Sequence, residues 1–260
     1  LATLEVLSRT GLFVEDDEAL AIFEEGGGVV DRERRVVRLP AHVVEDAVRS
    51  APPKVVLCGR TSERDVVLED GRVGFTNFGE GIQVVDPYTG ALHESRKQDV
   101  ADCTRLIDAL PEIDVVERPL GAHDVPQDTA SLHNAEAIFT NTTKHATIGP
   151  LTGFCARKMI DMAAAIVAGH ARLRERPLLS FLTCPVSPLK LVADCCRIII
   201  EGARGGVPVN VLSMAMALAS SPVNLAGTLV THNAEVLAGI TLAPLPADRK
   251  SAVEGKRVDL

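Results

Sequence analysis

Aromatic residues are scarce in this chain of 260 residues, which has no Trp, one Tyr and seven Phe. Permanent cations in proteins are usually held by aromatic faces or by carboxylates. These few rings do not favour an aromatic cage built from this chain alone. Any cation site is therefore expected to use a carboxylate or to borrow residues from elsewhere.

Long apolar runs are also missing. The chain has no stretch of 18 apolar residues and no basic-plus-apolar segment at its amino end. These absences exclude an evident membrane span and an evident secretion signal. We expect a cytoplasmic protein with no membrane partner.

Positive charge is not in excess, because the formal net charge is −8 and Lys and Arg are scattered among acids. A nucleic-acid partner is excluded on that ground, since phosphate binding needs a concentrated basic field. The six cysteines show no CxxC pair and no regular spacing with histidine. We therefore predict that the chain has neither a disulfide framework nor a metal site. This cysteine usage indicates a reducing compartment.

Residues 1–95 are rich in charges and turn signals. Their patterns predict short amphipathic elements rather than long ones. The helices are expected at 1–13, 16–27 and 41–52, and the β-hairpins at 29–40, 64–75 and 82–94. The second hairpin would turn at Asp70-Gly71, and the third through residues 86–90.

After Ser95 the rhythm changes to short apolar strands alternating with longer helices, which is typical of βαβ units and a parallel sheet. Ser95 with Gln98 predicts a capping box that opens the first helix. The strands are expected at 114–120, 145–150, 177–184 and 207–213, and the helices at 128–143, 152–169, 188–204 and 222–240. Ser187-Pro188 and Ser221-Pro222 would start the last two helices, each as an N-cap before a first-turn proline.

The predicted fold class is α/β. Four strand-helix units make half of a (β/α)8 TIM barrel, which typically needs about 250 residues. We expect three parts: a helix-and-hairpin region at 1–95, the first half of a barrel at 96–243, and a tail at 244–260 that lacks any strand or helix period. For the tail two interpretations stay open, a flexible end and a sequence that is not native. The pattern is that of a fragment.

Five phrases in order carry a family resemblance, and together they span nearly all of residues 1–243. They are the segment from "LEVLSRTGLF" to "VVLCGR", then "VGFTNFGEGIQVVDPYTG", "FTNTTKH", "CPVSPL" and "SSPVNLAGTLVTHNAEVLAG". The chain resembles the trimethylamine methyltransferase family, the MttB-type corrinoid methyltransferases. The resemblance implies a TIM barrel preceded by a helix-and-hairpin region, which agrees with the pattern of elements.

The resemblance also implies a reaction in one-carbon metabolism, including methanogenesis. Members move a methyl group from a tertiary or quaternary amine, such as trimethylamine or glycine betaine, to the Co(I) of a separate corrinoid protein. The implied partners are that corrinoid protein and a small methylated amine, with no cofactor bound directly; a homo-oligomer stays open. Trimethylamine enzymes engage the amine with a pyrrolysine in the second half of the barrel, which is absent here. We expect the chain alone to show no turnover, and no catalytic residue is assigned.

Candidate substrate contacts follow from the barrel rule, which places chemistry in the loops after the strands. Asp124, beside His123, follows the first strand, Ser187 follows the third, and Met214 and Met216 follow the fourth. For Asp124 the competing interpretation is a solvated loop that caps the next helix, and for Ser187 a simple N-cap. Met214 and Met216 suit a corrinoid face, although such residues more often only pack.

The segment "NFGEG" supplies the other candidates. Gly79 and Gly81 permit close backbone approach, and Glu80 between them could place a carboxylate over the barrel mouth, opposite a cationic amine. The competing interpretation is an exposed hairpin end. Lys144 precedes the second strand, on the non-catalytic face, and is expected to be structural.

The stretch Ser220 to Ala243 predicts a buried scaffold helix. Its barrel-facing stripe is expected to comprise Leu225, Leu229, Val236, Leu237 and Ile240. Asn233 would be half-buried on that stripe and hydrogen-bonded, since an unpaired buried amide costs about 1–3 kcal/mol. His232 and Glu235 would point elsewhere.

Two other functions remain open beside the methyltransferase. One is a different TIM-barrel enzyme, a lyase or hydrolase, that uses acid-base residues such as Asp124 or Glu80. The other is a non-catalytic fragment that acts as an interaction module.

Overall fold

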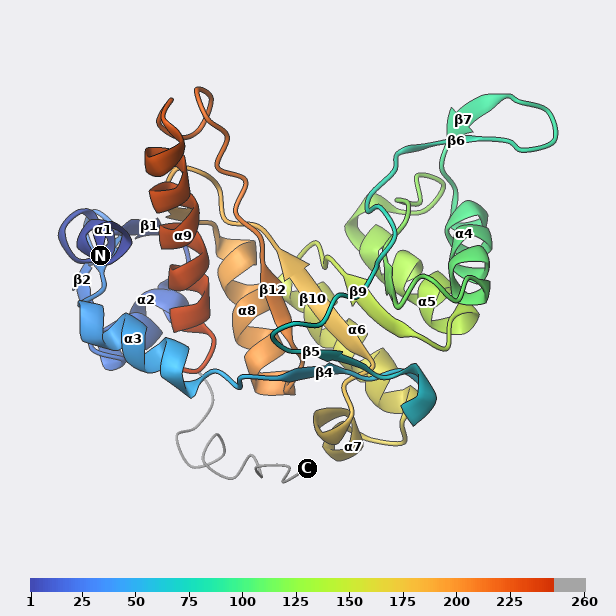
Figure 1. Ribbon diagram of the computed structural model, residues 1–260, viewed down its shortest axis with the longest axis horizontal. Helices are drawn as coiled ribbons and strands as arrows, with labels where there is room; N and C mark the ends of the chain where they lie inside the picture. The colour runs from blue at the N-terminus through green and yellow to red at the C-terminus, as the bar shows by residue number, and fades with distance from the viewer. Residues whose placement is uncertain (246–260) are drawn as a thin grey trace. The chain divides into compact units, whose positions relative to one another are not determined.

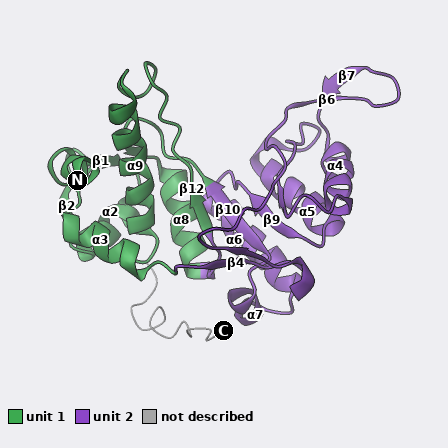
Figure 2. Cartoon of the chain, in the orientation of Figure 1, with its two compact units in different colours: residues 1–52, 183–204, 209–260 green, residues 53–182, 205–208 purple. Residues whose placement is uncertain are grey.

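The computed structural model describes residues 1–245 (Figure 1). Its contacts group into two compact units, which Figure 2 shows in different colours and which we describe separately. Unit 1 comprises Leu1–Pro52, Thr183–Arg204 and the chain from Val209 onward; unit 2 comprises Pro53–Leu182 and Gly205–Pro208. The boundaries expected at residues 95 and 243 stay a prediction. The tail expected at 244–260 lies, from residue 246, outside the described residues.

The amino-terminal part of unit 1 combines short helices with a small sheet. The helices are α1 (Ala2–Glu5), which continues as a π-helix over Val6–Thr10, α2 (Asp17–Glu25) and α3 (Ala41–Ser50). The strands are β1 (Leu12–Val14), β2 (Val29–Asp31) and β3 (Val36–Arg38). The hairpin predicted at 29–40 is confirmed, because β2 and β3 pair antiparallel.

The helix predicted over residues 1–13 ends earlier, at Thr10. Gly11 follows with φ +78°, and a side chain there would collide with the carbonyl of Val37. The chain can therefore turn sharply and place β1 against β3 only because residue 11 is glycine. A local helical pattern could not reveal that strand.

The carboxy-terminal part of unit 1 contains β11 (Lys190–Leu191), α8 (Ala193–Gly205), β12 (Val209–Val211) and α9 (Leu225–Leu242). The helices predicted from residues 188 and 222 begin later, at Ala193 and Leu225. Lys190–Leu191 pairs in parallel with β1, completing a sheet of order β11-β1-β3-β2. That pairing holds residues 190–191 extended, which excludes them from α8. Asn224 is the N-cap of α9, since its side chain accepts a hydrogen bond from the Gly227 amide at 2.7 Å.

Helix α9 buries a different face from the predicted one. Leu225 and Leu229 are 76% and 59% exposed, and Asn233 is exposed rather than half-buried. The buried side is formed instead by small residues and one acid: Thr231, Ala234, Glu235, Ala238, Gly239, Thr241 and Leu242. Small residues let the helix approach its neighbours closely, and a Cβ at Gly239 would lie 2.8 Å from Val211 Cγ1. The predicted stripe was wrong at Leu225 and Leu229, because the close contacts of this helix need small side chains and the two large ones face solvent.

Unit 2 contains the parallel strands. In chain order it holds β4 (Val55–Leu57), β5 (Val66–Leu68), β6 (Gln83–Val85), β7 (Leu92–Glu94), α4 (Lys97–Ala109), β8 (Val115–Glu117), α5 (Ala130–Asn141), β9 (His145–Ile148), α6 (Gly153–Ile166), α7 (His170–Glu175) and β10 (Leu179–Thr183). Short 3-10 turns at Ser62–Arg64 and Gln127–Thr129 precede β5 and α5. Along the chain β8, β9 and β10 alternate with helices, and Figure 1 labels β9 and β10 together with α5 and α6.

The strands β8, β9 and β10 lie side by side and run parallel. Val116 is opposite Ala146, and Phe181 is opposite Ile148. One face of these strands is apolar and fully buried, with Val116, Ala146, Ile148, Leu179 and Phe181. This alternation of parallel strand and helix is the α/β repeat of a partial (β/α)8 barrel, as predicted.

Two local predictions in unit 2 have different outcomes. The hairpin at 82–94 is confirmed, because β6 and β7 pair and Asp86 accepts hydrogen bonds from the amides of Tyr88 and Thr89. The hairpin at 64–75 is wrong, since β5 pairs with the upstream strand β4. The capping box is shifted by one residue: Asp99 accepts a hydrogen bond from the Arg96 amide at 2.7 Å, and Ser95 is buried.

Candidate functional site

The segment "NFGEG" is held beside β8 along its whole length. Thr76 bridges to Val115 and Gly81 to Leu120, both in parallel. The Asn77 side chain accepts from the Glu117 amide at 2.9 Å and donates to the Glu117 carbonyl at 2.8 Å. The segment therefore runs toward the carboxyl end of β8, where a barrel carries its chemistry.

Glu80 is placed at that end but its charge is already paired. Its carboxylate forms an ion pair with Arg118, whose side chain is 11% exposed against 44% for Glu80. Arg118 also donates to the carbonyl of Gly149, the residue that follows β9, at 3.4 Å. Glu80 thus lies near the carboxyl ends of both β8 and β9, and Arg118 compensates its charge.

Glu117, the last residue of β8, was missed by the sequence analysis. Burial raises the pKa of its carboxyl, and the negative charge of Glu80 raises it further against the opposing effect of Arg118. A Cβ at Gly79 would lie 2.8 Å from Glu117 Oε1, so this carboxylate rests directly against the glycine backbone. The sequence offers no clear signal for it, because Asp114 and Arg118 beside the two valines are charged as well.

Polar side chains continue across the same face of the strands. Thr147 on β9 is directly opposite Glu117, and Ser180 on β10 is directly opposite Thr147. The hydroxyls of Thr147 and Ser180 are 2.9 Å apart, and Ser180 Oγ is 3.0 Å from His145 Nε2. His145 Nδ1 is in turn 3.1 Å from the Cys58 carbonyl oxygen. A hydrogen-bonded row therefore runs from Cys58, just after β4, to Thr147 in the middle of β9.

Asp124 and Lys144 both contact backbone groups at the ends of α4. The Asp124 carboxylate accepts from the Lys97 amide at 2.8 Å, so it binds the start of α4, the helix before this loop, and not the next helix that the capping interpretation named. Beside it, His123 Nδ1 is 3.2 Å from Ser95 Oγ. Lys144 is buried and donates to the carbonyls of Ile107 and Leu110 at 2.7 and 2.6 Å, which agrees with a structural role.

Ser187 belongs to unit 1 and is not an N-cap. Its hydroxyl donates to Glu235 Oε2 at 2.7 Å. The same carboxylate accepts from Ser213 Oγ at 2.5 Å and from the Leu189 amide at 2.9 Å. Glu235 is 1% exposed, so the prediction that it points elsewhere was wrong. This buried acid holds the segments that follow β10 and β12.

Met214 and Met216 follow β12 and are 53% and 55% exposed. Other apolar residues of the same stretch are exposed with them, namely Leu212 and Leu218. The two methionines are thus accessible in unit 1, as a contact with another surface would require.

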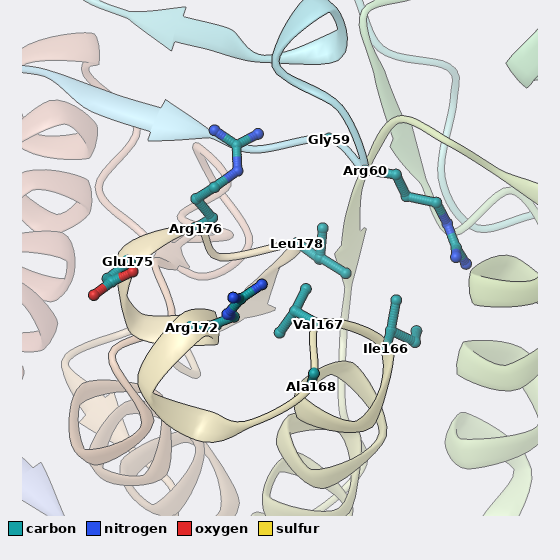
Figure 3. A pocket seen from close by; sticks show the side chains of 9 residues that line it. All are labelled: Gly59, Arg60, Ile166, Val167, Ala168, Arg172, Glu175, Arg176 and Leu178. Atoms are coloured by element: carbon teal, nitrogen blue, oxygen red, sulfur yellow. The ribbon is translucent and has the colours of Figure 1, made fainter.

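Unit 2 also contains a pocket of about 550 Å³, shown in Figure 3. It is lined by Gly59, Arg60, Ile166, Val167, Ala168, Arg172, Glu175, Arg176 and Leu178. Arg176 binds Asp65 through both terminal nitrogens, at 2.8 and 2.7 Å, and Arg60 donates to the Thr142 carbonyl at 3.0 Å. Leu178 directly precedes β10, so the pocket lies at the amino end of that strand, away from the end where barrels carry chemistry.

Within residues 1–245, no group of three His, Cys, Asp or Glu side chains could hold a metal ion. No disulfide bond joins the cysteines of this part of the chain. None of its helices combines the length and the apolar character needed to cross a membrane.

Comparisons with known proteins agree on one family. The profile of the trimethylamine methyltransferase (MTTB) family matches residues 2–255. The chain is 51% identical to the trimethylamine methyltransferase MttB of Desulfitobacterium hafniense over 244 residues, covering 94% of this chain and 49% of that protein. It is 43% identical to MttB of Methanosarcina thermophila over 251 residues, covering 95% and 52%.

Two more distant relatives are a glycine betaine methyltransferase and a monomethylamine methyltransferase of known structure. A glycine betaine methyltransferase of Desulfitobacterium hafniense is 29% identical over 243 residues, covering 93% of this chain and 50% of that protein. The crystal structure of the Methanosarcina barkeri monomethylamine methyltransferase (MtmB) superposes with a TM-score of 0.51 at 13% identity, over 94% of this chain and 62% of that one. That likeness shows the fold alone. The chain spans about half the length of the curated relatives it matches.

Proposed function

Because the chain belongs to the trimethylamine methyltransferase family, we propose that it forms part of an enzyme that takes a methyl group from a methylated amine. The acceptor in this proposal is the Co(I) of a corrinoid carried by a separate protein, so the corrinoid is a substrate of the reaction rather than a group held by this chain. Trimethylamine is the favoured donor, since the relatives named for it are 51% and 43% identical and the glycine betaine enzyme 29%.

One structural observation supports this proposal most strongly: two carboxylates, Glu80 and Glu117, meet where parallel strands end. An N-methyl group leaves readily only when its nitrogen is fully substituted or otherwise cationic. The protein must hold that cation and aim one methyl group at the cobalt, so positioning contributes much of the catalysis. With Glu80 paired to Arg118, the three side chains together carry one net negative charge when both acids are ionised, which suits a cation.

The exposed Met214 and Met216 fit the docking of an apolar macrocycle face, and we keep them as proposed contacts of the corrinoid. Gly79 and Gly81 are proposed to serve the site by letting the backbone approach Glu117 and Leu120. A cytoplasmic location belongs to the same proposal, because a Co(I) corrinoid survives only in a reducing compartment.

The test is a spectrophotometric assay with the full-length protein and a Co(I) corrinoid protein. Trimethylamine is expected to convert the Co(I) spectrum to that of methyl-Co(III), and glycine betaine to do so more slowly. A corrinoid that stays unmethylated with every methylated amine, although a known methyltransferase methylates it in parallel, would refute the proposed function.

A further inference from the structure

Glu117 carries a carboxylate that the rest of the described chain leaves without a hydrogen-bond donor. Within residues 1–245 the charges that act on it are Glu80, which repels it, and Arg118. The two terminal nitrogens of Arg118 are engaged by Glu80 and Gly149, and its Nε is buried without a partner. Its oxygen lies against the Gly79 backbone, so water has limited room on that side. A half-buried acceptor of this kind is stabilised by a cation placed beside it.

The hydrogen bonds next to Glu117 have a fixed direction. The Cys58 carbonyl can only accept, so His145 must donate to it from Nδ1. Burial lowers the pKa of His145 to about 4, so the ring is neutral near pH 7 and carries no second proton. Nε2 therefore accepts, and Ser180 must donate to it.

The donor and acceptor roles of His145 and Ser180 also fix the role of Thr147. The single hydroxyl proton of Ser180 is used on His145, so Ser180 Oγ can only accept from Thr147 Oγ1 at 2.9 Å. The proton of Thr147 is then used as well. Thr147 presents only lone pairs to its surroundings, on the strand directly opposite Glu117.

We propose that Glu117 and Thr147 form an acceptor-only subsite for a small alkylammonium cation, and that Ser180 and His145 are positioning residues that aim the Thr147 hydroxyl. The inference rests on the proposed function and deepens it, because it names the groups that hold the substrate's charged end. A tertiary ammonium would donate its N–H to these oxygens, and a quaternary one would present its polarised methyl groups. An anion finds no hydrogen-bond donor in Glu117 or Thr147.

The experiment measures binding of tetramethylammonium and of trimethylammonium to the full-length protein by isothermal titration calorimetry. Glu117→Gln keeps the shape of the side chain and removes its charge, and we expect the Kd for both cations to rise roughly tenfold or more. The matched control is Arg172→Gln, which removes a charge from the pocket at the amino end of β10 and should leave both Kd values unchanged.

A double-mutant cycle tests the positioning role. Ser180→Ala frees the Thr147 proton to turn toward the cation, so binding should weaken several-fold in the wild-type background. In a Thr147→Val background the same change should have almost no further effect, whereas Thr147→Ser should restore near-normal binding. A purely structural role for Ser180 would give equal losses in both backgrounds. Nitrogen NMR of His145 should show a neutral ring protonated at Nδ1 at pH 7.

The possible results distinguish failure of the cation subsite from failure of the proposed methyl transfer. Unchanged cation binding by Glu117→Gln, or additive effects of Ser180→Ala and Thr147→Val, would overturn the subsite even if the wild-type protein methylates the corrinoid. Tight cation binding that is lost in Glu117→Gln, without any methyl transfer by the wild type, would support the subsite and refute the proposed function.

Discussion

Acidification should destabilise the protein through a single buried histidine. His145 has no exposed surface, and its ring contacts the Cys58 and Pro177 carbonyls and the Ser180 hydroxyl. The negative charge of Asp65 acts on it from farther away. Burial opposes its protonation and outweighs the two carbonyls and Asp65, which lowers its pKa from 6.5 to about 4. In the unfolded chain the ring is solvated and regains its ordinary pKa.

The sign of the effect follows from which state binds the proton. Between pH 6.5 and about 4 the unfolded chain takes up a proton at residue 145 that the folded chain does not, so the free energy of unfolding falls as the pH falls. Each pKa unit of difference between the folded and the unfolded state corresponds to about 1.4 kcal/mol. Acidification across the whole range therefore lowers the free energy of unfolding by about 3 kcal/mol. Below that window both states are protonated and this residue causes no further loss.

Urea unfolding at several pH values between 7 and 4 measures the effect, with His145→Gln as the comparison because its amide does not titrate. The wild type should lose about 3 kcal/mol more than the variant across the window. Should the variant fail to fold, NMR titration of the wild-type ring gives the same answer, since the ring should stay neutral at pH 5. Parallel stability curves, or a ring that titrates near its ordinary pKa, would refute the reasoning.

Three further predictions concern α9, each read from thermal or urea unfolding. Glu235→Gln should cost about 2 kcal/mol, because the amide keeps only one acceptor for the donors that the carboxylate satisfies, and a loss under 0.5 kcal/mol would contradict the contacts seen. Gly239→Ala should cost about 1–3 kcal/mol through overlap with Val211, whereas Asn233→Ala on the exposed side should stay within about 0.5 kcal/mol; equal effects would reject the assigned face. Asn224→Ala should cost about 1 kcal/mol as an N-cap loss, and Ser221→Ala much less; the reverse order would restore the N-cap predicted from the sequence.

The parallel repeat could be predicted from the sequence because its signal is local. Strands such as β10 are short, mainly apolar runs, and the helices between the strands have a clear period. The hairpin at 82–94 was likewise predictable, since the Asp86 turn carries its own hydrogen bonds. Features stabilised within a dozen residues of one another are visible without a structure.

The errors have a common physical origin in partners that lie far away in the chain. Pro188 looks like a first-turn proline, yet the residues just after it form a strand with β1, more than 170 positions upstream. Glu235 looks like a surface acid, but its donors are Ser187 and Ser213 on two other segments. No local pattern encodes such pairings.

The candidate site was half predictable for the same reason. Gly79, Glu80 and Gly81 stand out as a glycine-rich segment, and they do reach the carboxyl end of β8. Glu117 does not stand out, because a strand of three residues gives too little alternation to show which side chains face inward. The direction of the Thr147 hydroxyl depends on His145 and Ser180 together, which only the paired strands reveal.

The measurement that tests the central claim most directly is a crystal structure of the full-length protein with tetramethylammonium. The account predicts density for the cation between the Glu117 carboxylate and Thr147 Oγ1, at the carboxyl ends of β8 and β9. Density at the Asp124 loop or in the arginine-lined pocket, with the oxygens of Glu117 and Thr147 left to water, would contradict it.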